Sequence, residues 1–249
     1  MNQDTSMLPS MQEQEENLPQ LNGNLMEELK ILMQRSQPFQ EMMMMYKCAI
    51  REVRTKAEVL NDEMSVRYHR NPIKNILSRV KKPESIAQKL VKKNLPFTVE
   101  AIMANLSDVA GVRIICEFVD DIYKIAAMLA MQDDLKLVKI KDYIKYPKPN
   151  GYRSYHMIVE IPVFFSKGKT PMRVEIQIRT IAMDFWASLD HELKYKKNID
   201  PQEEEMIANE LLSCADRIAE TDMIMQQIRM KLDSVEENGE KPDAVFSQN

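Results

Sequence analysis

Two neighbouring segments carry polar residues at every second position. These residues are Tyr152, Ser154 and His156 in KPNGYRSYHMIVEI (148–161), and Arg173, Glu175, Gln177 and Arg179 in MRVEIQIRT (172–180). Because strand side chains point alternately to the two faces, each segment predicts a strand with one polar face. Burying polar groups costs free energy, so an ordinary core strand has few of them. An aromatic ring, an imidazole, a carboxylate and two guanidiniums together indicate a nucleotide-binding surface.

A basic segment earlier in the chain adds cations to this set. Arg79 and Lys81 alternate at the end of a predicted strand, and Lys89 follows in a predicted helix that Pro83 opens. We interpret these side chains as a grip on a polyphosphate, since arginine and lysine both bind phosphate oxygens. Taken alone, the segment is more typical of a solvated charged edge.

Two carboxylates complete the candidate chemistry. Asp108 stands just before a strand that Arg113 interrupts, and it could hold Mg²⁺, which takes one or two carboxylates. Glu175 could complete that metal site or accept a proton from an attacking hydroxyl. Simpler alternatives remain open for single residues. Asp108 could be a turn residue, His156 a structural histidine, and Glu175 the ion-pair partner of Arg173 or Arg179.

The composition narrows the class of protein. The chain has 249 residues, 44% hydrophobic content and a net charge of −4, which predicts a globular core and argues against a broad nucleic-acid-coating surface. Five glycines and no glycine-rich phosphate loop mean that side chains must bind any phosphate. Three scattered cysteines predict neither disulfides nor a zinc site, and favour a cytoplasmic location. We expect no signal peptide and no membrane span.

The order of expected elements indicates a mixed-sheet α/β domain with helical additions. We expect strands near 75–80, 111–118 and 135–145, in addition to the two polar strands, and helices near 24–35, 83–91, 98–105, 120–131 and 181–194, with Asp120 as an N-cap. Two longer helices, 39–64 and 201–233, carry heptad-like apolar stripes. The first stripe is Phe39, Met43, Tyr46, Ile50, Val53, Ala57, Leu60 and Met64. For it we favour core filling over partner binding. The second is Ile207, Leu211, Cys214, Ile218, Thr221, Met225, Ile228 and Leu232, and the two helices could pack together within one subunit or across subunits.

Four motifs resemble the small alarmone synthetases of the RelA/SpoT family, most closely the RelQ type. They are RVKKPESIAQKL (79–90), LSDVAGVRIIC (106–116), DYIKYPKPNGYRSYHMIVEIPVF (142–164) and VEIQIRTIAMDFWASLDHELKYKK (174–197). One departure is Lys82, where the family commonly has serine. The resemblance implies transfer of the β,γ-pyrophosphate of ATP to the 3′-hydroxyl of GTP or GDP, giving (p)ppGpp and AMP.

The resemblance also implies a role for each matching residue. Arg79 and Arg113 would sandwich the adenine, and Lys81 and Lys89 would contact the ATP phosphates. Asp108 would bind Mg²⁺, and Glu175 would position or activate the 3′-hydroxyl and share the metal. Tyr152 would stack on the guanine. The remaining residues expected to line the GTP/GDP site are Lys148, His156 and Gln177.

For the whole chain, the family implies a nucleotidyltransferase-like mixed sheet of about five strands and a homotetramer. We expect a disordered tail at 1–22, N-terminal helices at 23–70, the catalytic core at 71–197, a helix at 198–235 and a second disordered tail at 236–249. We expect neither an alarmone hydrolase domain nor a ribosome-sensing region. An allosteric (p)ppGpp site is a family expectation that the sequence does not place. The alternative function is a catalytically weak protein that binds guanine nucleotides or single-stranded RNA.

Overall fold

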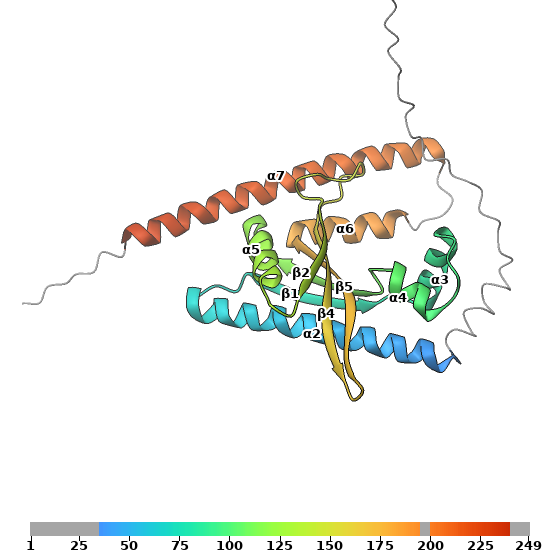
Figure 1. The fold of residues 1–249 in the computed structure, drawn as a ribbon. Coiled ribbons are helices and arrows are strands. Elements are labelled where there is room, and N and C mark those ends of the chain that lie inside the picture. Colours follow the sequence, from blue (N-terminus) through green and yellow to red (C-terminus); the bar gives the residue numbers. More distant parts are fainter. Residues whose placement is uncertain (1–34, 195–199, 240–249) are drawn as a thin grey trace, which may run out of the picture.

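The computed structural model describes residues 35–194 and 200–239, and these form one mixed sheet with surrounding helices (Figure 1). Within this part of the chain the strand order is β1-β2-β5-β4-β3; β2 and β5 are parallel and the other pairs antiparallel. The strands are β1 (Ile73–Val80), β2 (Ala110–Cys116), β3 (Lys136–Asp142), β4 (Tyr155–Phe165) and β5 (Gly168–Thr180). The helices are α2 (Gln37–Tyr68), α3 (Pro83–Lys92), α4 (Val99–Asn105), α5 (Val119–Ala130), α6 (Ile181–Lys194) and α7 (Pro201–Gly239). The predicted mixed sheet with helical extensions is confirmed.

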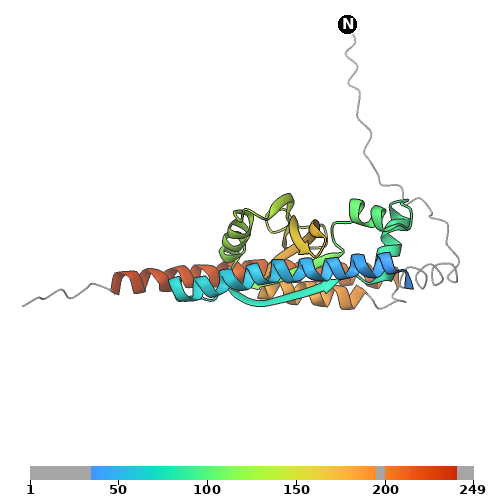
Figure 2. The same ribbon diagram turned by 60° about the horizontal axis from the view of Figure 1, so that its bottom comes forward.

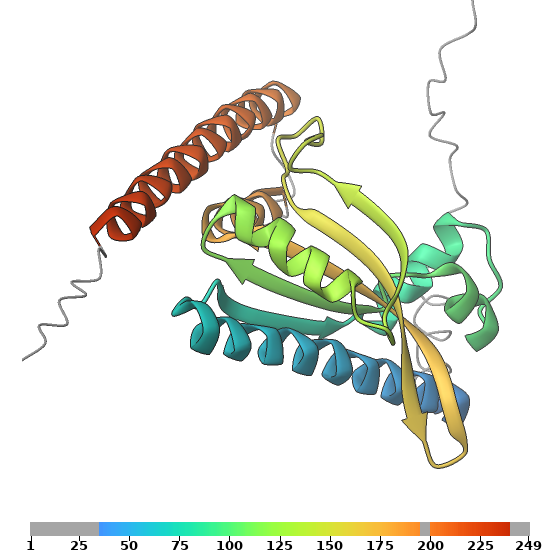
Figure 3. The same ribbon diagram turned by 60° about the vertical axis from the view of Figure 1, so that its left-hand side comes forward.

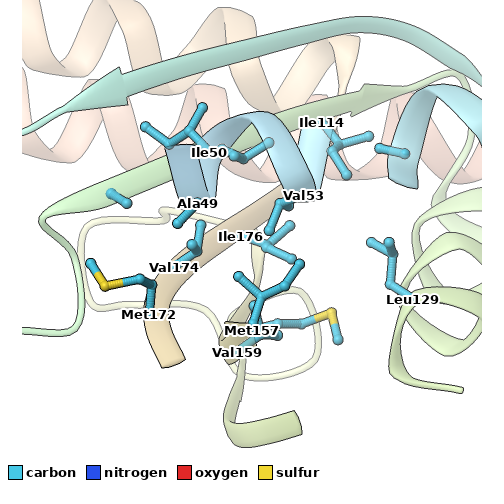
Figure 4. Close-up of a cluster of buried hydrophobic side chains, with 14 of the residues drawn as sticks. Ala49, Ile50, Val53, Ile114, Leu129, Met157, Val159, Met172, Val174 and Ile176 are labelled. Carbon is cyan, nitrogen blue, oxygen red and sulfur yellow. The ribbon is translucent and has the colours of Figure 1, made fainter. Parts of the chain in front are cut away.

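One face of the sheet is apolar and is covered by α2 and α5. Figure 4 shows Ala49, Ile50 and Val53 of α2 against Val174 and Ile176 of β5, with α5 contributing from the side. The stripe predicted on α2 therefore fills the core, as favoured, although Met42 rather than Met43 is the fully buried methionine. Each large apolar side chain buried in this way stabilises the fold by about 1.5–3 kcal/mol.

The two long helices lie on opposite sides of the sheet. In Figures 1 and 3, α2 runs along one side and α7 along the other, while α6 lies between α7 and the strands. Figures 1 and 2 place α3 and α4 at the opposite end of the sheet from α5. The heptad-like stripes of α2 and α7 therefore do not pair with each other within this subunit.

The face that α7 turns to its own subunit differs from its predicted stripe. The buried residues are Ala215 and Asp222, whereas Cys214, Met225 and Leu232 of the stripe are exposed. The stripe residues Ile207, Leu211 and Ile218 are half-buried, and the inner face combines polar contacts with the apolar contact of Ala215. A heptad-like pattern reports only an amphipathic helix, so it did not indicate which face meets the sheet domain.

The prediction that Asp120 caps α5 is wrong. The helix begins at Val119, its N-cap is Phe118, and no side chain of that residue caps it. Instead, Gln226 of α7 accepts the backbone N–H of Asp120 at 3.0 Å. The Asp120 carboxylate pairs with Arg229 of α7 at 2.7 Å, so a distant helix satisfies this helix end.

Other boundaries shift by a few residues. β2 ends at Cys116 rather than 118, β3 stops at Asp142 rather than 145, and α7 continues to Gly239. The expected tail at 1–22 and nearly all of the helix expected at 24–35 lie outside the described residues. All three cysteines are free. Among the described helices, none has the length and apolar character needed to cross a membrane.

Strand β5 passes directly into α6 at Thr180, which is fully buried. The Thr180 hydroxyl accepts the Met183 N–H at 3.0 Å and so caps the helix. The same hydroxyl donates to the Asp222 carboxylate of α7 at 2.7 Å. Burial raises the pKa of Asp222, and the Thr180 hydrogen bond opposes that rise. One hydroxyl thus joins the central strand, α6 and α7.

We predict that Thr180→Val lowers the free energy of unfolding by roughly 2–3 kcal/mol, because it removes the helix cap and leaves a buried carboxylate without its donor. Urea unfolding followed by circular dichroism would measure the loss. Thr221→Val is the matched control, since Thr221 is exposed on α7, and its effect should stay within about 0.5 kcal/mol. Equal losses in the two variants would contradict the role given to Thr180.

Candidate functional site

The opposite face of the sheet carries the predicted polar residues in one row. Residues paired across neighbouring strands point to the same side, so the register fixes which side chains meet. One line of partners runs from β2 through β5 and β4 to β3, and consists of Arg113, Gln177, His156 and Lys141. A second line runs from β1 to β5, and consists of Arg79, Gly111 and Glu175. The predicted alternation along β5 is therefore confirmed.

The first polar strand begins later than predicted. Strand β4 starts at Tyr155, and residues 143–154 form a connection from β3 that we call the Tyr152 loop. Gly151 has a positive φ of 85°, and the turn is closed by a hydrogen bond from the Lys148 N–H to the Tyr152 carbonyl at 3.2 Å. This tight turn is incompatible with an extended strand from residue 148, but it still brings Tyr152 back over β4.

Four side chains form a hydrogen-bond chain along the polar face. Arg179 donates to the Tyr152 hydroxyl, whose oxygen lies 2.8 Å from Nε2 of His156. Nδ1 of His156 lies 3.3 Å from Oε1 of Glu175. Since Arg179 occupies the hydroxyl as an acceptor, the phenol proton can go to Nε2, and His156 then donates from Nδ1. The chain ends on the carboxylate with a partner for each group.

Glu175 is held in its ionised form. Burial tends to raise its pKa, but hydrogen bonds from His156 and from Gln177, at 2.9 Å, outweigh burial and lower the pKa below its ordinary value. The alternative in which Glu175 forms an ion pair with Arg173 or Arg179 is wrong. Arg173 lies 4.0 Å from Glu160, and Arg179 pairs with Asp184 at 3.0 Å.

Asp108 forms ion pairs with the two lysines of the basic segment. Lys81 from the end of β1 lies 2.8 Å from Oδ2, and Lys89 from α3 contacts the same oxygen. Burial tends to raise the pKa of Asp108, but these two lysines outweigh it and lower the pKa. The charged-edge alternative therefore does not describe Lys81, whose side chain is 13% exposed, whereas the Lys89 side chain remains 42% exposed. Asp108 also raises the pKa of Glu175 slightly by its negative charge, so the two carboxylates share one electrostatic site.

Asp184, in the first turn of α6, connects two arginines of the site. Its Oδ1 accepts from Arg113 at 3.1 Å and from Arg179 at 3.0 Å. Burial, followed by the nearby positive charge of Arg179, lowers the pKa of Arg113, whereas Asp184 raises it. Asp184 was not among the site residues predicted from the sequence. Its place four residues beyond a polar strand, at the start of a helix, was the only signal for it.

Tyr143 is another residue that the sequence argument missed. Its ring makes edge contacts with Tyr152 and His156, with centroid distances of 5.9 and 5.1 Å. The Lys148 ammonium lies 4.8 Å from the Tyr143 ring centre and 4.7 Å from that of Tyr152. Two aromatic rings and a cation therefore form the wall beside His156. Arg79 completes the opposite end, where its side chain lies over Gly111.

The residues present fit a magnesium ion that is shared with a polyphosphate. Asp108 and Glu175 are both ionised and only partly buried. Within 35–194 and 200–239, no group of three or more metal-ligating side chains occurs. A metal ion at these two carboxylates would have to complete its shell with phosphate oxygens and water, which is the usual arrangement for Mg²⁺.

Comparison with known proteins shows which proteins this chain resembles. The profile of the "Region found in RelA / SpoT proteins" matches residues 78–200. The GTP pyrophosphokinase YwaC of Bacillus subtilis is 41% identical, over 84% of this chain and 97% of the relative. The GTP pyrophosphokinase YjbM of the same organism is 38% identical, over 61% of this chain and 70% of the relative.

Solved structures agree with the sequence comparison. The small alarmone synthetase 2 of Bacillus subtilis superposes with a TM-score of 0.69 and 40% identity, covering 78% of this chain and 98% of the other. The small alarmone synthetase 1 of the same organism, bound to its product pppGpp, superposes with a TM-score of 0.67 and 35% identity, covering 75% and 93%.

The lysine contacts predict that Lys81→Met raises the pKa of Asp108, because one of the two cations that stabilise its charged form is lost. Carbon-detected NMR titration of the aspartate carboxyls would measure the change. Lys82→Met is the matched control, because Lys82 is the adjacent, exposed lysine and the ion pairs with Asp108 come from Lys81 and Lys89. An unchanged Asp108 pKa in Lys81→Met would show that the ion pair does not form in solution.

Proposed function

The chain belongs to the RelA/SpoT family of GTP pyrophosphokinases, and from this membership and the site geometry we propose the reaction that it catalyses. The protein transfers the β,γ-pyrophosphate of ATP to the ribose 3′-hydroxyl of GTP or GDP, which yields (p)ppGpp and AMP. In this reaction the 3′-oxygen forms a bond to the β-phosphorus, and the bond from that phosphorus to the α,β-bridging oxygen breaks. AMP leaves, and the proton of the hydroxyl must be accepted by a base.

One observation carries this proposal. The cationic group around Asp108 and the aromatic and imidazole group around Tyr152 lie on the same face of one sheet, and Glu175 lies between them. Two different nucleotides could therefore bind with their reacting groups at Glu175. A protein that only binds anions gains nothing from two ionised carboxylates in its pocket, because they repel phosphate.

We assign the donor half of the site to the residues on β1, β2 and α3. Arg79 and Arg113 lie on the same face of paired strands, so the two guanidiniums can take the adenine between them. Lys81 and Lys89 bind the ATP phosphates. Because both now contact Asp108, the incoming phosphates would replace a carboxylate as their partner, and the lysines need little movement.

We assign the acceptor half to β4, β5 and the Tyr152 loop. The Tyr152 ring stacks on the guanine, while Lys148, His156 and Gln177 line the acceptor half of the site. Lys141 lies opposite His156 in the register and extends this cationic lining to the edge strand. Glu175 accepts the proton of the 3′-hydroxyl. The contact of 3.3 Å between Nδ1 of His156 and Oε1 of Glu175 supports this role, since it holds the carboxylate in place.

Mg²⁺ is the metal that we propose for Asp108 and Glu175, and when bound it would supply positive charge to the transferring pyrophosphate. The chain's own contribution is to hold two ionised carboxylates beside two lysines. The lysine and arginine side chains take the place of a glycine-rich phosphate loop, which is consistent with the five glycines of the whole chain.

The product assay is the direct test. Purified protein incubated with ATP, Mg²⁺ and either GTP or GDP should release AMP and form the corresponding 3′-pyrophosphorylated guanosine nucleotide. We predict that Glu175→Gln lowers kcat by at least about 100-fold, which is the scale of general-base catalysis, with little change in the melting temperature.

Glu160→Gln provides the matched control, because Glu160 of β4 lies on the same face of the sheet as Glu175. Its partners there are Lys136 and Arg173. Its kcat should stay within about twofold of the unmodified protein, as expected for a pair on a partly exposed face. Tight guanine-nucleotide binding without turnover would instead support the alternative of a binding protein. Full activity of Glu175→Gln would remove this residue from the catalytic role.

We also propose that the protein assembles as a homotetramer, which the resemblance to RelQ-type enzymes implies. The exposed apolar face of α7 supports assembly, since Met225 is 50%, Ile228 46% and Leu232 60% exposed. Light scattering should give four times the chain mass of 29.0 kDa. Leu232→Glu should lower that mass if α7 contributes to the contacts. A monomer at micromolar concentration in the unmodified protein would contradict the proposal.

A further inference from the structure

The Tyr152 loop has two sides that face different parts of the molecule. Tyr152 and Lys148 point toward the polar row of the sheet, where Lys148 contacts the Tyr152 ring and the Tyr152 hydroxyl contacts His156. The residues on either side of Tyr152, Gly151 and Arg153, contact α7 instead. The position of the Tyr152 ring is therefore set both by the sheet and by a helix that contributes no residue to the polar row.

Gly151 allows the loop to approach α7 more closely than any other residue would. A Cβ added at this position would lie 2.6 Å from the Cβ of Ala215 and 3.2 Å from Cδ1 of Leu212. Its φ of 85° is also in the region that glycine adopts without strain. Both the backbone conformation and the available space therefore require glycine here. The side chain of Ala215 is itself only 3% exposed, so the contact is fully packed.

Arg153 holds this contact closed from the other side of Tyr152. Its NH1 group donates to the carbonyl oxygens of Gly151, at 3.2 Å, and of Ala215, at 3.3 Å. Its NH2 group donates to the Asp216 carboxylate at 3.1 Å. The Arg153 side chain is only 17% exposed, whereas that of Asp216 is 63% exposed. The carbonyl contacts are thus the shielded ones, and the exposed ion pair contributes less.

The helix that receives the loop is fixed to the rest of the protein. Asp222 of α7 accepts the Thr180 hydroxyl at the end of β5, about two turns beyond Ala215. Leu211 accepts the indole N–H of Trp186 from α6 at 2.9 Å, one turn before Ala215. The surface that contacts Gly151 and Arg153 therefore lies between two anchors, and it can serve as a rigid support for the loop.

From these contacts we propose that Arg153 is a positioning residue, which locks the Tyr152 loop onto α7 through the Gly151–Ala215 contact and thereby sets the affinity for the acceptor nucleotide. This inference rests on the proposed function, because it takes Tyr152 as the guanine-binding residue. Arg153 acts through Tyr152 and does not contact the substrate. The donor residues lie on β1, β2 and α3, so the affinity for ATP does not depend on this lock.

The test measures both substrates in the same variants. Arg153→Ala should raise the KM for GTP about tenfold and leave the KM for ATP within twofold. Titration with a fluorescent GDP analogue, without ATP, should show the same loss of affinity. Arg153→Lys should have a KM for GTP between those of the unmodified protein and Arg153→Ala. An ammonium group cannot donate in the planar geometry that two carbonyls and a carboxylate require. Arg217→Ala, at an exposed neighbouring position of α7, is the matched control and should change neither KM.

A pair of substitutions tests the close contact itself. Gly151→Ala should raise the KM for GTP at least as much as Arg153→Ala, and adding Ala215→Gly should recover part of that loss by removing the clashing methyl group. Asp216→Ala should change the KM for GTP less than twofold. Equal increases in both KM values, or a lower melting temperature with unchanged nucleotide affinities, would overturn the proposal. If the unmodified protein forms no pyrophosphorylated product, the proposed function fails, and the GDP titration still decides whether the lock controls acceptor binding.

Discussion

The polar face of β5 is the constraint on which the rest of the site depends. This strand lies in the middle of the sheet between β2 and β4, and its other face is buried under α2 and α5, so its register cannot slip without exposing the core. The arginine, glutamate and glutamine side chains on the polar face must therefore find partners where they are, because an unpaired buried charge is costly. Arg179 and Glu175 find them at the two ends of one hydrogen-bond chain.

That requirement explains why elements far apart in the sequence meet at β5. Asp184 of α6 accepts hydrogen bonds from both Arg179 and Arg113, and His156 of β4 stabilises Glu175. Tyr152 joins the two groups, since its hydroxyl contacts both Arg179 and His156. The hydrogen bonds that pair these side chains also leave Glu175 ionised beside the lysines around Asp108. The contacts that satisfy these partly buried polar groups therefore also keep Glu175 ionised for the proposed chemistry.

Helix α7 supports the site from outside the sheet. Its inner face is small and polar, with Ala215 against Gly151 and Asp222 against Thr180, while much of its apolar surface remains exposed. Glycine is scarce in this chain, and one of the few glycines lies at this contact with α7. Gly151 serves a close approach between a loop and a helix, and lysine and arginine side chains are left to bind phosphate. Because α7 contacts the Tyr152 loop with one face and presents apolar side chains with another, assembly through α7 would act on a helix that already touches the acceptor side.

The sequence by itself determined the alternation along β5, the core-facing stripe of α2, the mixed α/β class and the residues of the four motifs, because hydrophobic periodicity and local residue chemistry are short-range properties of a chain. It did not determine where β4 starts, since the turn at Gly151 depends on the space that Ala215 leaves. It also did not reveal that Gln226 caps α5, that Asp184 joins two arginines, or that Tyr143 packs beside Tyr152. These contacts join residues separated by up to 106 positions. No local pattern encodes such pairs, because only the packed arrangement of strands and helices brings the partners within hydrogen-bonding distance.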